Sequence, residues 1–170
     1  MTQYLPAKKN ILLVLLAGGC LFVLLFAGLL RYSLRTARTI DPEDYSEAAS
    51  LSAMPENFVY TCAIQQQNGS LSFSGYALFQ GERFLQVDTS VVLYCAKTGI
   101  YLKLPTAMSP EYDATASVDD GINYSFGGYY AFVLQNQLAC SLSEYEICFA
   151  YRSSEHDMLV HTGQSAEATL

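Results

Sequence analysis

The sequence contains no tryptophan, only two histidines, and far fewer basic than acidic side chains. Its 170 residues include 9 Lys or Arg and 16 Asp or Glu, which gives a net charge of -7. Because neutralisation of phosphates by Lys and Arg supplies most of the affinity for DNA and RNA, this balance excludes nucleic acid as an expected partner. Charged residues are only 15% of the chain, whereas 51% are hydrophobic. Disordered chains show the opposite composition, so the sequence predicts a folded protein.

The sequence also lacks the common signatures of catalysis. It has no G-x-S-x-G, Walker loop, H-E-x-x-H or glycine-rich dinucleotide turn. No C-x-x-C pair is present, and His156 and His161 have no metal-ligand spacing, so we interpret both as surface residues and expect no metal. The turn at residues 119–121 has acidic oxygens that suit calcium, but we interpret it as a solvated turn. Glu144 and Glu146 have the spacing of charges on a solvent face. We therefore predict a protein without cofactor or enzymatic activity.

A long apolar run is the strongest single feature. Residues 11–30 contain no charge and are bracketed by Lys8 and Lys9 on one side and Arg31 on the other. A helix of this length covers the roughly 30 Å hydrocarbon layer of a bilayer. We therefore predict a transmembrane helix that acts as an uncleaved signal anchor. A buried core helix and a cleavable signal peptide are the alternatives.

The charge distribution predicts how the chain is divided. Residues 1–38 carry five basic residues and no acidic one, whereas the remainder carries all 16 acids. We predict a cytoplasmic tail at 1–10, the helix at 11–30, a juxtamembrane stalk at 31–56, an extracytoplasmic domain at 57–162 and a flexible tail at 163–170. The expected surroundings are a lipid bilayer and the cell envelope. Whether small residues in the helix also pair it with another helix stays open.

Four cysteines lie outside the apolar run, which itself holds Cys20. An even number of cysteines in an extracytoplasmic domain predicts disulfides, and four cysteines allow three pairings. We favour Cys62 with Cys95 and Cys140 with Cys148, because the second pair flanks a turn-like segment. The alternative is four buried free thiols.

The hydrophobic pattern after residue 57 has the period of two that is typical of strands. Asn68-Gly69 is the strongest hairpin signal, and Gly75 inside a strand indicates a bulge or a close backbone approach. We expect a polar connection over residues 106–123 and one short helical turn near 43–49. The whole predicts a mainly β fold, an antiparallel β-sandwich of about seven to eight strands preceded by the transmembrane helix.

The order of several motifs resembles a known class of protein. These motifs are Ser74-Gly75-Tyr76-Ala77, Val91-Val92-Leu93-Tyr94, Tyr101-Leu102-Lys103-Leu104-Pro105-Thr106, Tyr124-Ser125-Phe126-Gly127-Gly128-Tyr129 and Tyr145-Glu146-Ile147-Cys148. Together they resemble small β-sandwich accessory modules of bacterial cell-surface proteins, which accompany capsule or teichoic-acid glycosyltransferases. The resemblance covers residues 57–162. It implies a non-catalytic accessory role in cell-surface polysaccharide assembly.

Aromatic residues supply the candidate site. The chain has 13 tyrosines and 9 phenylalanines, and a tyrosine ring with its hydroxyl suits a half-wet binding surface. Tyr112, Tyr124, Tyr129 and Tyr130 are the candidate binding residues; alternatively, such tyrosines only cover two sheet faces. We predict an interaction module with a membrane-protein partner or a cell-surface glycan. Direct glycan binding is the second hypothesis, and an envelope hydrolase that uses the acids near residue 119 is the third.

Overall fold

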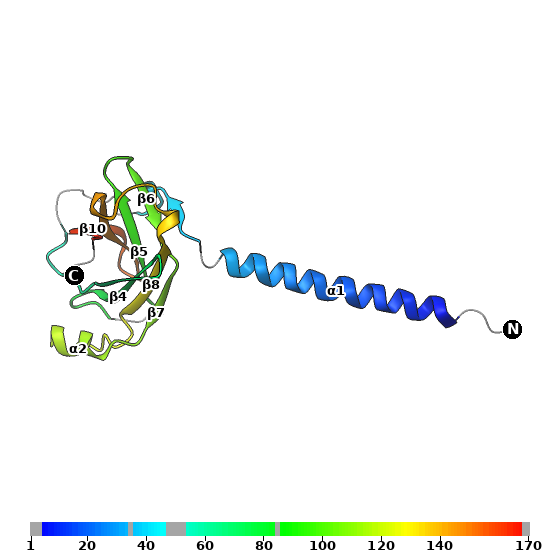
Figure 1. The fold of residues 1–170 in the computed structure, drawn as a ribbon. Coiled ribbons are helices and arrows are strands. Elements are labelled where there is room, and N and C mark those ends of the chain that lie inside the picture. The colour runs from blue at the N-terminus through cyan, green and yellow to red at the C-terminus, as the bar shows by residue number, and fades with distance from the viewer. Residues whose placement is uncertain (1–4, 34–35, 47–53, 84–85, 168–170) are drawn as a thin grey trace. The chain divides into compact units, whose positions relative to one another are not determined.

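The computed structural model describes residues 5–33, 36–46, 54–83 and 86–167. The chain forms two compact units, residues 1–36 and residues 37–170. The first contains helix α1 (Leu5–Ser33), and the second contains the strands and the short helix α2 (Tyr112–Val118) (Figure 1). The strands are β1 (Arg38–Ile40), β2 (Phe58–Tyr60), β3 (Ala63–Gln67), β4 (Ser70–Phe79), β5 (Asp88–Cys95), β6 (Ile100–Lys103), β7 (Thr106–Ser109), β8 (Gly128–Leu134), β9 (Tyr145–Arg152) and β10 (Asp157–Ser165).

Helix α1 corrects the prediction of a transmembrane helix. Among the described residues, no helix has both the length and the apolar character that crossing a membrane requires. The bounds differ too, because α1 runs from Leu5 to Ser33 and so takes in Lys8, Lys9 and Arg31 instead of ending at these charges. The prediction of a signal anchor over residues 11–30 is therefore wrong.

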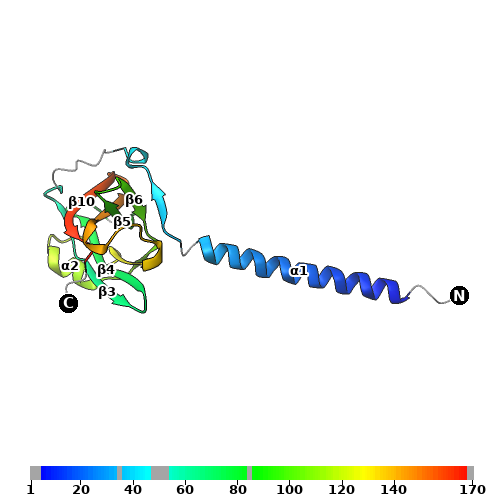
Figure 2. The ribbon, with the colours of Figure 1, turned by 45° about the horizontal axis from the view of Figure 1, so that its top comes forward.

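The β unit consists of two antiparallel sheets (Figures 1 and 2). One sheet has the order β1-β6-β5-β9-β10, and the other has the order β2-β4-β8-β7, with β3 paired to β4. Alternate side chains of both sheets enter one shared core, as the period of two requires. In this core Phe149 of β9 lies 5.9 Å from the Phe58 ring of β2 and 5.3 Å from the Tyr129 ring of β8.

The turn between β3 and β4 confirms the strongest hairpin signal of the sequence. Gln67 pairs with Ser70, and the two residues between them both have positive φ, 50° at Asn68 and 74° at Gly69. These angles are those of a type I′ turn, whose twist matches that of the paired strands. The two turn residues therefore favour this hairpin locally.

Other elements differ from the prediction. The described residues form ten strands instead of seven to eight, because part of the predicted stalk becomes β1 and part of the predicted polar connection becomes β7. The same connection also holds α2. At the end of the chain, β10 continues to Ser165 and Ala166 is fully buried, so the predicted tail begins too early. The predicted helical turn is a 3-10 turn at Pro42–Asp44, and residues 47–49 lie outside the described part of the chain.

The cysteines are free thiols in this structure. Neither predicted pair is formed: Cys62, Cys95 and Cys140 lie in or against the shared core, whereas Cys148 belongs to a second cluster. Cys148 projects from β9 on the side away from the shared core, where it contacts His161. Cys95 lies in the shared core at the end of β5, and Cys140 packs against the same core.

Candidate functional site

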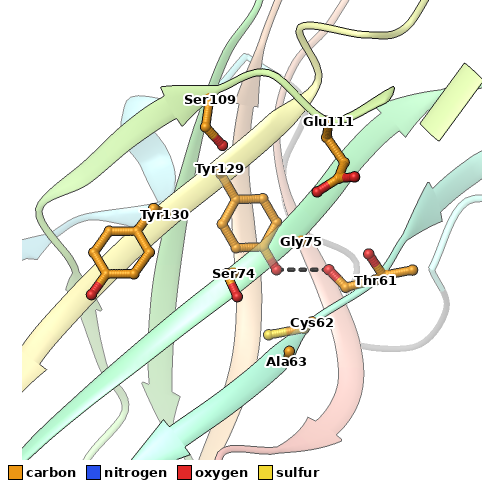
Figure 3. A pocket seen from close by; sticks show the side chains of 9 residues that line it. All are labelled: Thr61, Cys62, Ala63, Ser74, Gly75, Ser109, Glu111, Tyr129 and Tyr130. Carbon is orange, nitrogen blue, oxygen red and sulfur yellow. Dashed lines mark hydrogen bonds between the residues drawn. The ribbon is translucent and has the colours of Figure 1, made fainter. Parts of the chain in front are cut away.

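A pocket of about 590 Å³ opens on the sheet that contains β4, β7 and β8 (Figure 3). It is an open hollow of the surface, not an enclosed cavity. It lies where the chain passes from β2 to β3 and where β7 leads toward α2. Its lining residues are Thr61, Cys62, Ala63, Ser74, Gly75, Ser109, Glu111, Tyr129 and Tyr130.

Two glycines make this arrangement of backbones possible. A Cβ atom at Gly75 would lie 2.1 Å from the Thr61 carbonyl oxygen, and its φ of 153° disfavours other residues. A Cβ atom at Gly128 would lie 2.6 Å from both the Ser109 carbonyl oxygen and the Glu111 Cβ atom. Gly128 is opposite Tyr76 in the ladder between β4 and β8, one position from the pair Gly75 and Tyr129. The two glycines thus let Thr61 and Glu111 approach the sheet closely on either side of the pocket.

Tyr129 is the buried floor of the pocket, and its ring belongs to the shared core. Only 1% of its surface is exposed, and its hydroxyl donates a hydrogen bond to the Thr61 carbonyl oxygen at 2.8 Å (Figure 3). Burial raises the pKa of this hydroxyl, and the neighbouring Cys62 raises it further. Burial likewise raises the pKa of the Cys62 thiol. Both groups are therefore neutral hydrogen-bonding partners near neutral pH.

The groups free to meet a ligand lie around this floor. Tyr130 follows Tyr129 in β8, so its side chain projects to the outer face of the sheet with that of its ladder partner Ser74, and 49% of it is exposed. Glu111 precedes α2 and is held by a hydrogen bond from its backbone N–H to the Ser125 carbonyl oxygen at 2.7 Å. Hydroxyls of threonine and serine complete the lining. Glu111 is the sole charged residue among the lining residues.

The structure places the four predicted binding tyrosines in three different settings. Tyr129 and Tyr130 line the pocket. Tyr112 directly follows the lining residue Glu111 and is 74% exposed. Tyr124 is fully buried, and its hydroxyl donates a 2.6 Å hydrogen bond to Asp120. That hydroxyl also accepts a bond from the Gly81 N–H at 2.8 Å, so Tyr124 supports the loop rather than presenting itself to a ligand.

Sequence reasoning missed most of the polar lining. Thr61, Ser109 and Glu111 lie outside the motifs of the sequence, whereas Ser74 begins one of them. Strand pairing between distant segments brings these residues together. One available signal was Gly75, whose position in a strand indicated close backbone approach. The second signal was Gly128, which plays the same part on the neighbouring strand.

The acidic turn is a structural element of its loop. Asp120 accepts hydrogen bonds from the Tyr124 hydroxyl, from the Gly81 N–H at 3.1 Å and from the Ile122 N–H at 3.0 Å. The hydrogen bond from Tyr124, together with the backbone bonds, lowers the pKa of the Asp120 carboxyl. Both carboxylate oxygens are thus engaged in shaping the turn.

The two histidines differ from their predicted surface positions. His161 is only 5% exposed. The His156 ring is stacked on Phe79, with ring centroids 4.1 Å apart. Periodicity alone gave no indication of either contact, because each joins different strands or loops.

Comparison of the chain with protein-family models gives no match, and neither the curated proteins nor the solved structures give a significant one.

Proposed function

We propose that the β unit is a non-catalytic binding module whose pocket takes a neutral or amine-bearing saccharide. The observation that carries this proposal is the grouping of an exposed ring, Tyr130, with one carboxylate, Glu111, around an open hollow lined by hydroxyls. A sugar ring offers a C–H face that packs on an aromatic ring and hydroxyls that hydrogen-bond to carboxylate and hydroxyl oxygens. The pocket supplies a partner for each of these groups.

The charge of the pocket narrows the class of ligand. Its lining includes no Lys, Arg or His, and the chain as a whole has a net charge of -7. Sites that bind phosphate-rich polymers depend on cationic or bidentate donors. A neutral sugar, or one with an amino group that pairs with Glu111, therefore fits better than an anionic one.

The same lining supports binding without cleavage. Most glycoside hydrolases use two carboxyl groups about 5–9.5 Å apart, one of which protonates the leaving oxygen. The described pocket holds only the carboxylate of Glu111. The motif resemblance to accessory modules of polysaccharide machinery supports a cell-surface glycan as the source of the saccharide.

Calorimetric titration of the full chain with a panel of neutral and amino-sugar oligosaccharides tests this proposal. For a saccharide that binds, we expect Tyr130→Ala to weaken the affinity roughly tenfold, because a packed aromatic face is lost. Glu111→Gln weakens binding by removing the charged acceptor. The matched control is Leu134→Ala, since Leu134 is a partly exposed residue of β8 outside the pocket. Equal affinity for all variants, or binding of none of the oligosaccharides, would contradict the proposal.

A further inference from the structure

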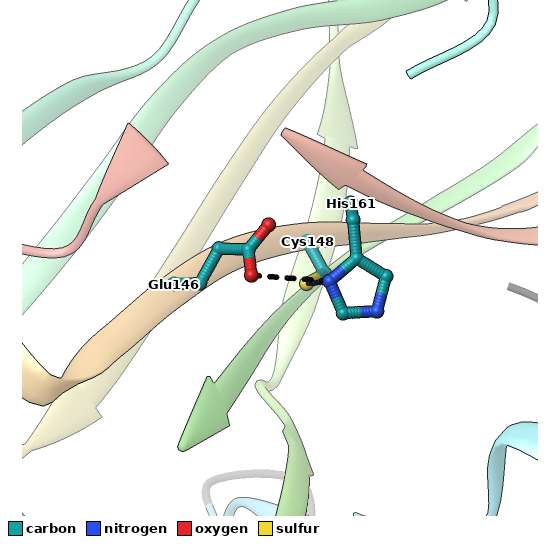
Figure 4. Close-up of side chains that lie close together, drawn as sticks. All are labelled: Glu146, Cys148 and His161. Carbon is teal, nitrogen blue, oxygen red and sulfur yellow. Dashed lines mark hydrogen bonds and ion pairs between the residues drawn. The ribbon is translucent and has the colours of Figure 1, made fainter. Parts of the chain in front are cut away.

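A second cluster of reactive groups lies on the other sheet, away from the pocket. Glu146 and Cys148 are two residues apart in β9, so their side chains project from the same face. His161 of β10 is directly opposite Cys148 in the strand register. The carboxylate, thiol and imidazole therefore converge on one point of the sheet (Figure 4).

Two of the ligand-atom distances in this cluster are close to those of a tetrahedral site. The His161 Nδ1 atom is 3.1 Å from Glu146 Oε2 and 3.4 Å from Cys148 Sγ. All three ligand atoms lie within 4.8 Å of one another. Zinc bonds of 2.0–2.3 Å at tetrahedral angles place neighbouring ligand atoms roughly 3.3–3.6 Å apart. Small side-chain shifts would therefore seat an ion among them.

The surroundings hold the carboxylate and the imidazole in place. Between His161 and Ser165 the register shifts, and within this irregularity the Gly163 N–H donates a 2.8 Å hydrogen bond to Glu146 Oε1. The other carboxylate oxygen is thereby directed at His161. The far nitrogen of the ring, Nε2, is 3.1 Å from the Tyr101 hydroxyl. Such outer hydrogen bonds are the usual support of metal-ligating carboxylates and histidines.

We propose that Glu146, Cys148 and His161 bind a divalent ion of the zinc type. A thiolate, an imidazole and a carboxylate together select borderline ions over calcium or magnesium, which prefer oxygen ligands alone. The thiolate and the carboxylate together carry two negative charges, which balance the two positive charges of the ion. Cys148 is fully buried and His161 is 5% exposed. The Glu146 side chain is 27% exposed, which gives solvent a route to the fourth coordination position.

Cobalt(II) titration of the freshly reduced full chain tests the site, because a cysteine thiolate on Co²⁺ absorbs in the near ultraviolet. We expect a charge-transfer band and tetrahedral visible bands that saturate at about one ion per chain and disappear when Zn²⁺ is added. Cys148→Ser removes the charge-transfer band, whereas the matched control Cys140→Ser keeps it. Glu146→Gln weakens the affinity at least about tenfold, as even the loss of an outer partner does.

Three outcomes would overturn the site. The first is the absence of a charge-transfer band with excess Co²⁺. The second is a charge-transfer band that persists in Cys148→Ser but is lost in Cys140→Ser. The third is an unchanged Co²⁺ affinity in Glu146→Gln. Circular dichroism checks the fold of each variant. If Cys148→Ser does not fold, two other measurements test the site. One is the Co²⁺ affinity of Glu146→Gln, whose substituted residue is partly exposed. The other is a zinc-dependent rise in melting temperature, which should be absent in His161→Gln.

Discussion

At the residue scale, the pocket depends on positions where no side chain is tolerated. A methyl group at Gly128 would press on the Ser109 carbonyl oxygen and on Glu111 Cβ, each 2.6 Å away. We therefore expect Gly128→Ala to lower the free energy of unfolding by about 1–3 kcal/mol, the usual cost of overpacking. The variant would also displace Glu111 from the pocket. Urea unfolding of the variant and the parent checks this expectation. An unchanged midpoint would show that β7 moves aside without loss of stability.

The residues of the two sites differ in how far the sequence reveals them. Tyr129 and Tyr130 were identifiable because adjacent tyrosines in a strand supply one buried and one exposed ring. Glu111 was not, because its place in the pocket depends on the pairing of β7 with β8. His161 was not either, because its partners are 13 and 15 residues earlier in the chain and meet it only through the β9–β10 register. Such contacts depend on which strands pair, so no regular spacing in the local sequence reveals them.

At the scale of elements, the β3–β4 hairpin is encoded by its local sequence, whereas the central connection over residues 106–123 is not. The β3–β4 hairpin is encoded by Asn68 and Gly69, two residues that accept positive φ. By contrast, β7 and α2 form in a segment whose composition is typical of a loop. The strand β7 exists because β8 offers an unpaired edge to residues 106–109. Tertiary pairing here overrides weak local preference.

Cys95 and Cys140 connect two elements in a way that can be tested. Cys95 ends β5, and Cys140, which precedes the 3-10 turn Leu142–Glu144, packs against the same core. Burial raises the pKa of Cys95, but hydrogen bonds from Cys140 and Thr98 outweigh this and lower it. We expect diamide to join this pair: both thiols lose a proton, and their two electrons reduce the N=N bond of diamide to a hydrazine.

Peptide mapping by mass spectrometry identifies the product of this oxidation. The expected bridge is Cys95–Cys140, and Cys140→Ser abolishes it whereas Cys62→Ser leaves it intact. Recovery of Cys62–Cys95 or Cys140–Cys148 instead would restore the pairing that the sequence favoured and contradict the structure.

At the scale of the whole molecule, buried phenols make the β unit sensitive to alkali. Burial raises the pKa of Tyr101 and of Tyr124 from 10.0 to about 12, and for Tyr124 the hydrogen bond to Asp120 adds to the effect. The unfolded chain therefore loses these protons first. The stabilisation is complete below pH 10 and is lost between pH 10 and about 12. We expect the melting temperature to fall over this interval.

The Tyr124→Phe variant provides the control for this pH dependence, because it removes one of the shifted groups. Its melting temperature should fall less steeply above pH 10 than that of the parent chain. Identical slopes in the two proteins would mean that Tyr124 does not contribute to the alkaline transition.

An NMR titration of the isotope-labelled full chain with a saccharide that binds in calorimetry locates the binding site residue by residue. We expect shift changes concentrated at the lining residues Thr61, Ser74, Ser109, Glu111 and Tyr130. Residues of β9 and β10, on the other sheet, should remain unperturbed. Changes confined to β9 and β10, or no changes at saturating saccharide, would contradict the assignment of the pocket as the binding site.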